Sequence, residues 1–163
     1  MYRHNIMKVN YTTYDVRRAE DVINPNTDHK DIMLLSADSS DPHYSNHQYI
    51  YARVLGIYHV NIIYARTGQS DYRPQRMEFL WVRWFANIDD EPVERSWSHQ
   101  KLDCMQLLPV NHPGSFGFVD PADVLRGSHI MPRFFMGKCH VDGRGISVCA
   151  RDSEDWRQYY VGR

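Results

Sequence analysis

The stretch YIYARVLGIYHVNIIY, residues 49–64, decides the fold class of this chain. Tyrosine, valine and isoleucine dominate it, and these side chains fit the pleated, half-buried surface of a β-strand. Because side chains alternate between the two faces of a strand, one face is predicted to be core. The predicted core face consists of Ile50, Ala52, Val54, Gly56, Tyr58, Val60 and Ile62. The other face is mixed, as in a strongly bent strand, and Gly56 is the expected bend or bulge.

A second run, MEFLWVRWF at residues 77–85, is apolar on both faces. Between the two runs lies a polar segment, residues 65–76, that contains glycine and proline. Two strand-like runs separated by such a segment indicate an antiparallel pair. We therefore expect residues 49–64 and 77–85 to be adjacent strands joined by a mobile loop.

The rest of the chain offers shorter strand candidates and no ten-residue stretch with a clean period of 3.6. The N-terminal residues 1–48 are polar and turn-rich, and are predicted to form an extension with one strand at 31–36 that packs on the following domain. Further strands are predicted at 102–108, 130–135 and 156–161. Pro132 confines one of them to a sheet edge, because proline lacks the N–H that a central strand uses.

One short helical turn is predicted after Asp120, since aspartate is a favoured cap and proline is favoured at the first helical position. Val124 and Leu125 would then pack inward, and Gly127 would end the turn. Together these features predict a mainly β, single-domain protein with five to seven short strands, long loops and one or two short helices. Residues 49–163 are expected to form a small, strongly curved β-barrel, which buries both faces of its strands and removes sheet edges.

Composition limits the function classes. A chain of 163 residues has the length of one domain, and 42% hydrophobic with 24% charged residues argues against wholesale disorder. Nineteen basic against twenty acidic residues exclude a protein that is basic overall, as nucleic-acid binders commonly are. No apolar run approaches 18 residues and no signal peptide is readable, so we expect no membrane partner. Three cysteines without a CxxC pair indicate reduced thiols in an intracellular protein.

One zone, residues 49–88, is both basic and aromatic, with five arginines against Asp71 and Glu78. The arginines are candidate contacts for phosphate or an acidic partner. They are Arg53, Arg66, Arg73, Arg76 and Arg83. Tyr51 and Trp81 are the candidate aromatic pocket, because aromatic rings attract cations. The alternative is that these arginines lie on an ordinary surface and that the rings fill the core.

No motif of a known catalytic site is present: GxSxG, HExxH, Walker A and GxGxxG are all missing from the sequence. Asp120 and Asp123 with a histidine are the residues of the alternative, a metal-dependent hydrolase, but a helix cap and a first-turn acid are the stronger interpretation of the two aspartates. His59 is expected to be a hydrogen-bonded structural residue. The acidic cluster at 152–155 is expected to be a solvated loop.

The cysteines do not match a zinc site, because Cys139 and His140 are adjacent and Cys149 is distant, whereas zinc ligands come in pairs two to four residues apart. We therefore predict no metal, no cofactor and no catalytic residue.

Five strings carry a family resemblance. They are VNYTTYDVRR (9–18), YARVLGIYHV (51–60), FLWVRWF (79–85), FGFVDPADVLR (116–126) and DWRQYYV (155–161). Over essentially the whole chain they resemble a family of uncharacterised, transposon-associated proteins of mushroom-forming fungi. In many members of that family more sequence follows the final strand, so this chain is expected to stop short of a natural boundary.

In pattern and order, the chain is also similar to a transposase-associated domain of plant CACTA elements. More remotely, YARVL followed by WVRWF and VLRG is similar to bromo-adjacent homology domains, which are distorted β-barrels of chromatin proteins. These resemblances imply a non-catalytic, nuclear binding module of a mobile-element protein that acts on chromatin, DNA or a partner protein. The alternatives are a fragment of a metal-dependent nucleic-acid hydrolase, or a purely structural domain that packs against the rest of a transposon protein.

Overall fold

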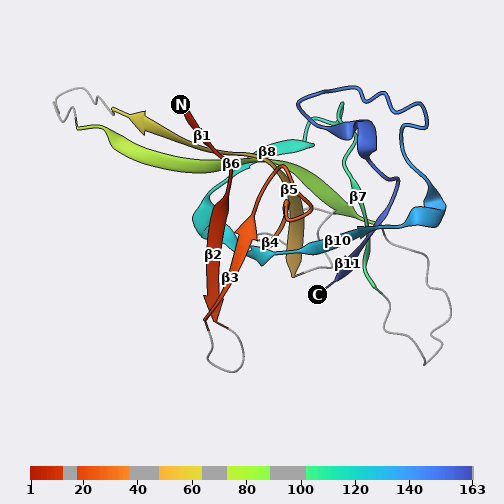
Figure 1. Cartoon of the computed structure of the whole chain (residues 1–163), viewed down its shortest axis with the longest axis horizontal. Helices are drawn as coiled ribbons and strands as arrows, with labels where there is room; N and C mark the ends of the chain where they lie inside the picture. Colours follow the sequence, from red (N-terminus) through yellow and green to blue (C-terminus); the bar gives the residue numbers. More distant parts are fainter. Residues whose placement is uncertain (13–17, 37–47, 64–72, 89–101, 163) are drawn as a thin grey trace.

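The computed structural model describes residues 1–12, 18–36, 48–63, 73–88 and 102–162, and these are mainly β, as predicted (Figure 1). The strands are β1 (Tyr2–His4), β2 (Met7–Thr12), β3 (Arg18–Ile23), β4 (Asp31–Leu35), β5 (Tyr49–Ile62), β6 (Gln75–Asn87), β7 (Cys104–Leu107), β8 (Phe116–Val119), β9 (Val124–Gly127), β10 (His129–Pro132) and β11 (Tyr159–Gly162). The helical elements are single 3-10 turns, η1 (Pro121–Asp123), η2 (Phe134–Met136) and η3 (Asp152–Glu154).

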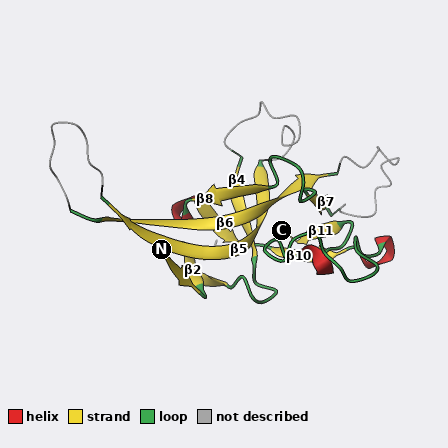
Figure 2. Ribbon diagram, turned by 90° about the horizontal axis from the view of Figure 1, so that it is seen from above, coloured by secondary structure: helices red, strands yellow, loops and turns green. Residues whose placement is uncertain are grey.

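β5 and β6 form the long central pair, and their antiparallel pairing confirms the prediction for residues 49–64 and 77–85. Gln75 and Arg76 belong to β6 and not to the predicted loop, most of which lies outside the described residues. The two strands run side by side along the molecule (Figure 2), and their distal ends project beyond β1, which is labelled in Figure 1. We call these ends, residues 60–62 and 75–77, the arm.

The predicted bulge is present, because the β5–β6 register shifts between Val54 and Gly56. An extra residue at a bulge reverses the alternation beyond it. Ile57 therefore joins Val54 in the same core cluster, whereas Ile62, a predicted core residue, is 40% exposed. The predicted core face is correct up to Val54 and wrong in its distal part.

The main sheet follows the order β10-β11-β7-β6-β5-β4-β9, with β1 added to β5 and β8 added to β6. Its two end strands, β9 and β10, are consecutive in the chain and are separated only by Ser128. β9 pairs with β4, and β10 pairs with β11. Within the described ranges no sheet closes, so the predicted barrel is wrong.

The physical reason for the opening is the turn that precedes β4. The backbone N–H of Ser128 donates to the Asp31 carbonyl at 2.9 Å, at the start of β4. Before Asp31 the chain turns back on itself, because Asn24 N–H donates to the His29 carbonyl at 2.8 Å. Because β4 begins only at Asp31, the residues before it turn away and do not extend the strand alongside β10.

The N-terminal residues contribute more than the one predicted strand. β1 pairs with β5, and β4 lies between β5 and β9, so both are integral parts of the main sheet. β2 and β3 form a separate two-stranded sheet. It packs on the main sheet through Val9 and Ile23, and Asp21 accepts a hydrogen bond from Gly127 N–H at 2.9 Å.

Two apolar clusters lie on the two sides of the β5–β6 pair. The larger contains Ala52 and Val54 of β5 with Leu80 and Val82 of β6. The second contains Tyr51, Phe85, Met105, Leu107, Tyr159 and Val161. Since both faces of the central pair are covered, neither strand needs the polar face that a half-solvated sheet would show.

The later part of the chain follows the prediction in part. The strands predicted at 130–135 and 156–161 are the shorter β10 and β11, and residues 134–136 form η2 instead of continuing a strand. Asp120 caps η1 by accepting a hydrogen bond from Ala122 N–H at 2.9 Å, and Pro121 is its first residue. β10 lies at a sheet edge, as Pro132 indicated. Gly127, however, does not end a helical turn, because residues 124–127 pair with β4 as β9.

Candidate functional site

Three charged side chains stand in one row across β4, β5 and β6. Asp31 is in register with Arg53, and Arg53 is in register with Arg83. Two like charges directly opposite each other on neighbouring strands destabilise a sheet unless they are neutralised. Asp31 is 3% exposed and Arg83 is 4% exposed, so water does not provide that neutralisation.

Asp155, which precedes β11, lies between the two arginines. Its Oδ2 accepts a hydrogen bond from Arg83 Nη1, and its Oδ1 lies 3.3 Å from Arg53 Nη1. Arg53 also donates to Asp31 through Nε at 2.9 Å and Nη2 at 3.3 Å, and Arg83 donates to the Leu108 carbonyl from Nε and Nη2. Two carboxylates thus balance two guanidinium groups, as buried charges require.

Aromatic rings enclose the guanidinium of Arg53. Its Cζ lies 5.3 Å from the ring centre of Phe85 and 5.2 Å from that of Tyr159. Burial by itself would lower the pKa of Arg53, but Asp31 and the Tyr159 hydroxyl raise the pKa above its ordinary value. Arg53 is therefore a fixed cation inside the domain.

The segment that carries Asp155, residues 133–158, is braced by a second buried carboxylate. Asp152 is 1% exposed and accepts hydrogen bonds from Ile146 N–H at 2.8 Å and Ser147 N–H at 3.0 Å. Cys139 N–H donates to the Asp155 carbonyl at 2.8 Å. Burial opposes ionisation of Asp152, but these backbone hydrogen bonds outweigh it and lower its pKa. The expected solvated acidic loop is therefore wrong for Asp152 and Asp155.

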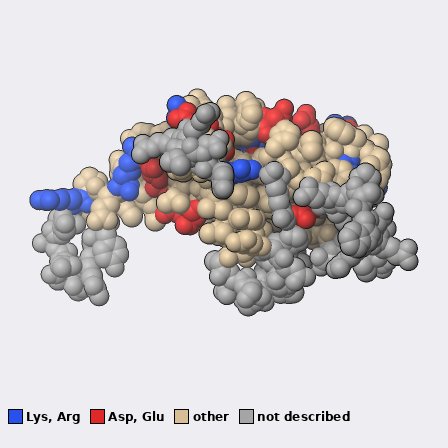
Figure 3. Space-filling view, turned by 90° about the horizontal axis from the view of Figure 1, so that it is seen from below, with Lys and Arg blue, Asp and Glu red and all other residues tan. Residues whose placement is uncertain are grey.

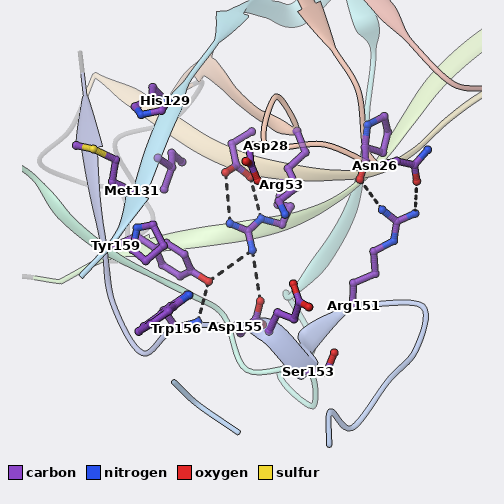
Figure 4. Close-up of a pocket in the computed structure, with 16 residues that line it drawn as sticks. Asn26, Asp28, Arg53, His129, Met131, Arg151, Ser153, Asp155, Trp156 and Tyr159 are labelled. Atoms are coloured by element: carbon purple, nitrogen blue, oxygen red, sulfur yellow. Dashed lines mark hydrogen bonds and ion pairs between the residues drawn. The ribbon is translucent and has the colours of Figure 1, made fainter. Parts of the chain in front are cut away.

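A cavity of about 560 Å³ opens above this ionic network (Figure 4). Arg53, Asp155 and Tyr159 line it, together with all four residues of β10. The turn before β4 and the η3 segment form its other walls. The guanidinium of Arg151, at the rim, donates to the Pro25 carbonyl and to Asn26 Oδ1, which ties these two walls together.

The five predicted contact arginines do not form one surface. Arg53 and Arg83 form ion pairs with Asp31 and Asp155, so their guanidinium groups belong to the internal network and not to an exposed basic surface. Arg66 lies outside the described residues. Arg73 and Arg76 are exposed near the arm, and Arg76 Nη2 lies 2.6 Å from Glu78 Oε1. In Figure 3 basic side chains gather at the arm end of the molecule with acidic ones beside them.

The structure does not bring together Tyr51 and Trp81, the two residues of the candidate aromatic pocket. Tyr51 is 3% exposed and belongs to the second apolar cluster, with Phe85 and Tyr159. Trp81 is half-buried and stacks on Phe116, with 5.9 Å between ring centres. The two rings lie in different packing groups and do not frame a common pocket.

The braced segment carries five exposed apolar side chains that the sequence did not indicate, and we refer to them together as its apolar surface. They are Phe134, Phe135, Val141, Ile146 and Val148, each at least 68% exposed. The ring of Phe134 contacts Trp156 edge to face at 5.0 Å, and Trp156 lines the cavity. Phe134 therefore adjoins a residue of the cavity lining.

No family model, curated protein or solved structure matches this chain. Among the described residues no three His, Cys, Asp or Glu side chains are grouped so that they could hold a metal ion. In the same residues no helix has the length and apolar character needed to cross a membrane.

The predicted structural role of His59 rests on a contact with β1. His4 Nε2 lies 2.6 Å from His59 Nδ1, and the ring of Tyr2 stacks on His59 with 4.8 Å between centres. A hydrogen bond between two imidazoles needs one bare nitrogen, so at least one ring must be neutral. Burial and the positive charges of Arg76 and His4 lower the pKa of His59, and Glu78 opposes them.

We expect an NMR titration to give His59 a midpoint below its ordinary value of about 6.5. Because the folded pKa is lower than the unfolded one, the contribution of neutral His59 to stability is fully present above about pH 6.5, the ordinary value, and is lost as the pH falls further through the lowered folded pKa. Replacing His4 by alanine removes one neighbouring charge and should raise the midpoint. A midpoint at or above the ordinary value in the unmodified chain would contradict the assignment.

Proposed function

We propose that this domain is a non-catalytic interaction module whose partner is another protein. The observation that carries the proposal is the apolar surface on residues 133–158. Large apolar side chains exposed together mark interaction sites, and interfaces gain specificity when a rigid frame positions the contact residues. Asp152 and Asp155 supply that frame, because both are buried and hydrogen bonded to their surroundings.

A protein partner is favoured over nucleic acid by the distribution of charge. Of the five arginines of the basic zone, two neutralise buried carboxylates and a third, Arg76, pairs with Glu78. Nucleic-acid affinity depends on the number of phosphates that are neutralised, so few available cations imply weak and salt-sensitive binding. An enzymatic role is disfavoured because Asp120 uses its carboxylate as a helix cap.

The resemblance to transposon-associated proteins of fungi, to the CACTA domain and to bromo-adjacent homology domains supports a mobile-element context in the nucleus. In that context the partner would be a chromatin protein or another part of the transposon protein.

The test compares two variants of the full chain, expressed with a tag in the cells that produce it. Replacing Phe134 and Phe135 by serine should reduce the recovery of a specific partner at least tenfold, because buried aromatic anchors dominate interface energies. Phe118 on β8 is 73% exposed, and its replacement by serine is the matched control. Partner proteins are quantified by mass spectrometry, and a labelled DNA duplex is titrated in parallel.

Equal recovery of every partner by both variants would contradict the proposal, as would duplex binding that persists at high salt.

A further inference from the structure

β10 has one paired edge and one open edge. Arg133 N–H donates to the Gln158 carbonyl at 2.9 Å, next to the Pro132–Tyr159 register pair. Since hydrogen-bonded and non-bonded pairs alternate along an antiparallel ladder, Met131 and His129 also direct their backbone groups toward β11. Ile130 and Pro132 therefore direct theirs to the opposite edge.

No described residue occupies that opposite edge. Within the described part of the chain, the N–H and C=O of Ile130 and the C=O of Pro132 have no hydrogen-bond partner. Pro132 itself fits this arrangement, because the position that lacks an N–H is the one that faces away from β11. Exposed strand edges are sites where another chain can pair.

The cavity described above runs along this edge. All four β10 residues line it, and the turn before β4 forms the opposite wall. The opening exists because the β4–β9 pairing ends at Asp31 and Ser128, so the place of the next strand beside β10 is vacant.

The charges around the cavity select an uncharged occupant. Asp31 and Asp155 are balanced by Arg53 and Arg83 below the floor. At the rim, the carboxylates of Asp28 and Glu154 are matched by the cationic side chains of Lys30 and Arg151. A phosphate backbone or a strongly charged segment would meet no excess of opposite charge here.

We propose that the open edge of β10 binds an extended, uncharged segment of a partner protein by strand addition. This inference rests on the proposed function and names its site. The added strand receives three main-chain hydrogen bonds, with the N–H and C=O of Ile130 and the C=O of Pro132. Its side chains alternate, and those on the side of Ile130 face the cavity floor at Trp156 and Tyr159, where apolar groups are favoured.

The probe is a random octapeptide library displayed on phage and selected on the full chain. We expect the selected peptides to be apolar at alternate positions. In synthetic copies, N-methylation should weaken binding about tenfold at every second amide and hardly at all between them, because only alternate amides face β10. Binding should also slow hydrogen exchange of the Ile130 N–H.

Two protein variants complete the test. Ile130→Pro removes the outward N–H and should weaken binding at least tenfold. Phe118→Ser, at an exposed residue of β8 that does not line the cavity, should bind normally. The proposal would be overturned if N-methylation did not weaken binding at alternate amides. It would also be overturned if a folded Ile130→Pro variant bound the peptide with full affinity. If the unmodified chain forms a dimer and Ile130→Pro makes it monomeric, the edge binds a second copy of this chain. If a DNA duplex displaces the peptide, the edge binds nucleic acid. Either result would also overturn the proposal.

Failure of this inference is distinguishable from failure of the proposed function. If partner recovery depends on Phe134 and Phe135 but no peptide binds at β10, the interaction module stands and strand addition falls. If peptides bind at β10 but partner recovery is independent of the two phenylalanines, the apolar surface loses its assigned role.

Discussion

Replacing Asp155 by alanine is expected to lower the free energy of unfolding by about 3–5 kcal/mol, because removing one partner leaves buried charges uncompensated. Asp155 is 3% exposed and contacts both Arg53 and Arg83, which are in register with each other on adjacent strands. Without the carboxylate, two guanidinium groups repel each other on one face of the sheet. Urea unfolding followed by circular dichroism measures the change.

The matched control is Glu154→Ala, since Glu154 is the exposed neighbouring acid and surface substitutions usually change stability by less than about 0.5 kcal/mol. A third variant, Arg83→Met combined with Asp155→Leu, removes both charges of one pair and should recover part of the loss. If Asp155→Ala and Glu154→Ala have equal effects, Asp155 does not balance the two arginines.

The long strands were predictable because their signal is local. Residues 49–64 and 77–85 carry the β-prone residues and the polar spacer that define an antiparallel pair, and Gly56 marks the bulge. What the bulge does to the faces beyond it depends on how many residues it inserts. The pattern alone therefore placed Ile62 in the core, although it lies on the exposed arm.

The open sheet could not be predicted from the same pattern. Closure depends on whether β10 finds a second neighbour, and a turn of seven residues, 24–30, decides that by its internal hydrogen bonds. The residues Asn24, Pro25 and Asn26 are typical of a turn, but residue types alone do not give the direction in which the chain leaves that turn.

The candidate site was missed because its members are far apart in sequence. Arg53 meets Asp31 across 22 positions and Asp155 across 102, and Arg83 meets Asp155 across 72. A charge count over residues 49–88 gives an excess of arginine, but Asp31 and Asp155, the partners of Arg53 and Arg83, lie outside those residues. One signal was available: Asp31 opens an apolar strand, and a buried carboxylate at such a position requires a cation.

Replacing Phe85 by alanine is the second change with a large expected effect, a loss of about 3–5 kcal/mol in the free energy of unfolding. Phe85 is 1% exposed and contacts Tyr159 edge to face, with 5.5 Å between ring centres. Its removal leaves a cavity in the second apolar cluster and takes away one of the two rings beside the Arg53 guanidinium. The packing loss and the lost cation–π contact therefore act in the same direction.

Two comparisons separate these contributions. Phe85→Leu keeps most of the side-chain volume but not the aromatic ring, so it should lower the free energy of unfolding by much less than Phe85→Ala. In a background where Arg53 and Asp31 are both replaced by neutral residues, no cation–π contact remains to be lost. The effect of Phe85→Leu should be smaller still in that background. Phe118→Ala, at a phenylalanine that is 73% exposed, is the control for loss of a ring at the surface and should change stability little. Urea unfolding could show that Phe85→Ala lowers the free energy of unfolding no more than Phe118→Ala does. In that case the Phe85 ring does not stabilise the ionic network that holds Asp155, and the rigid frame proposed for the interaction surface loses this support.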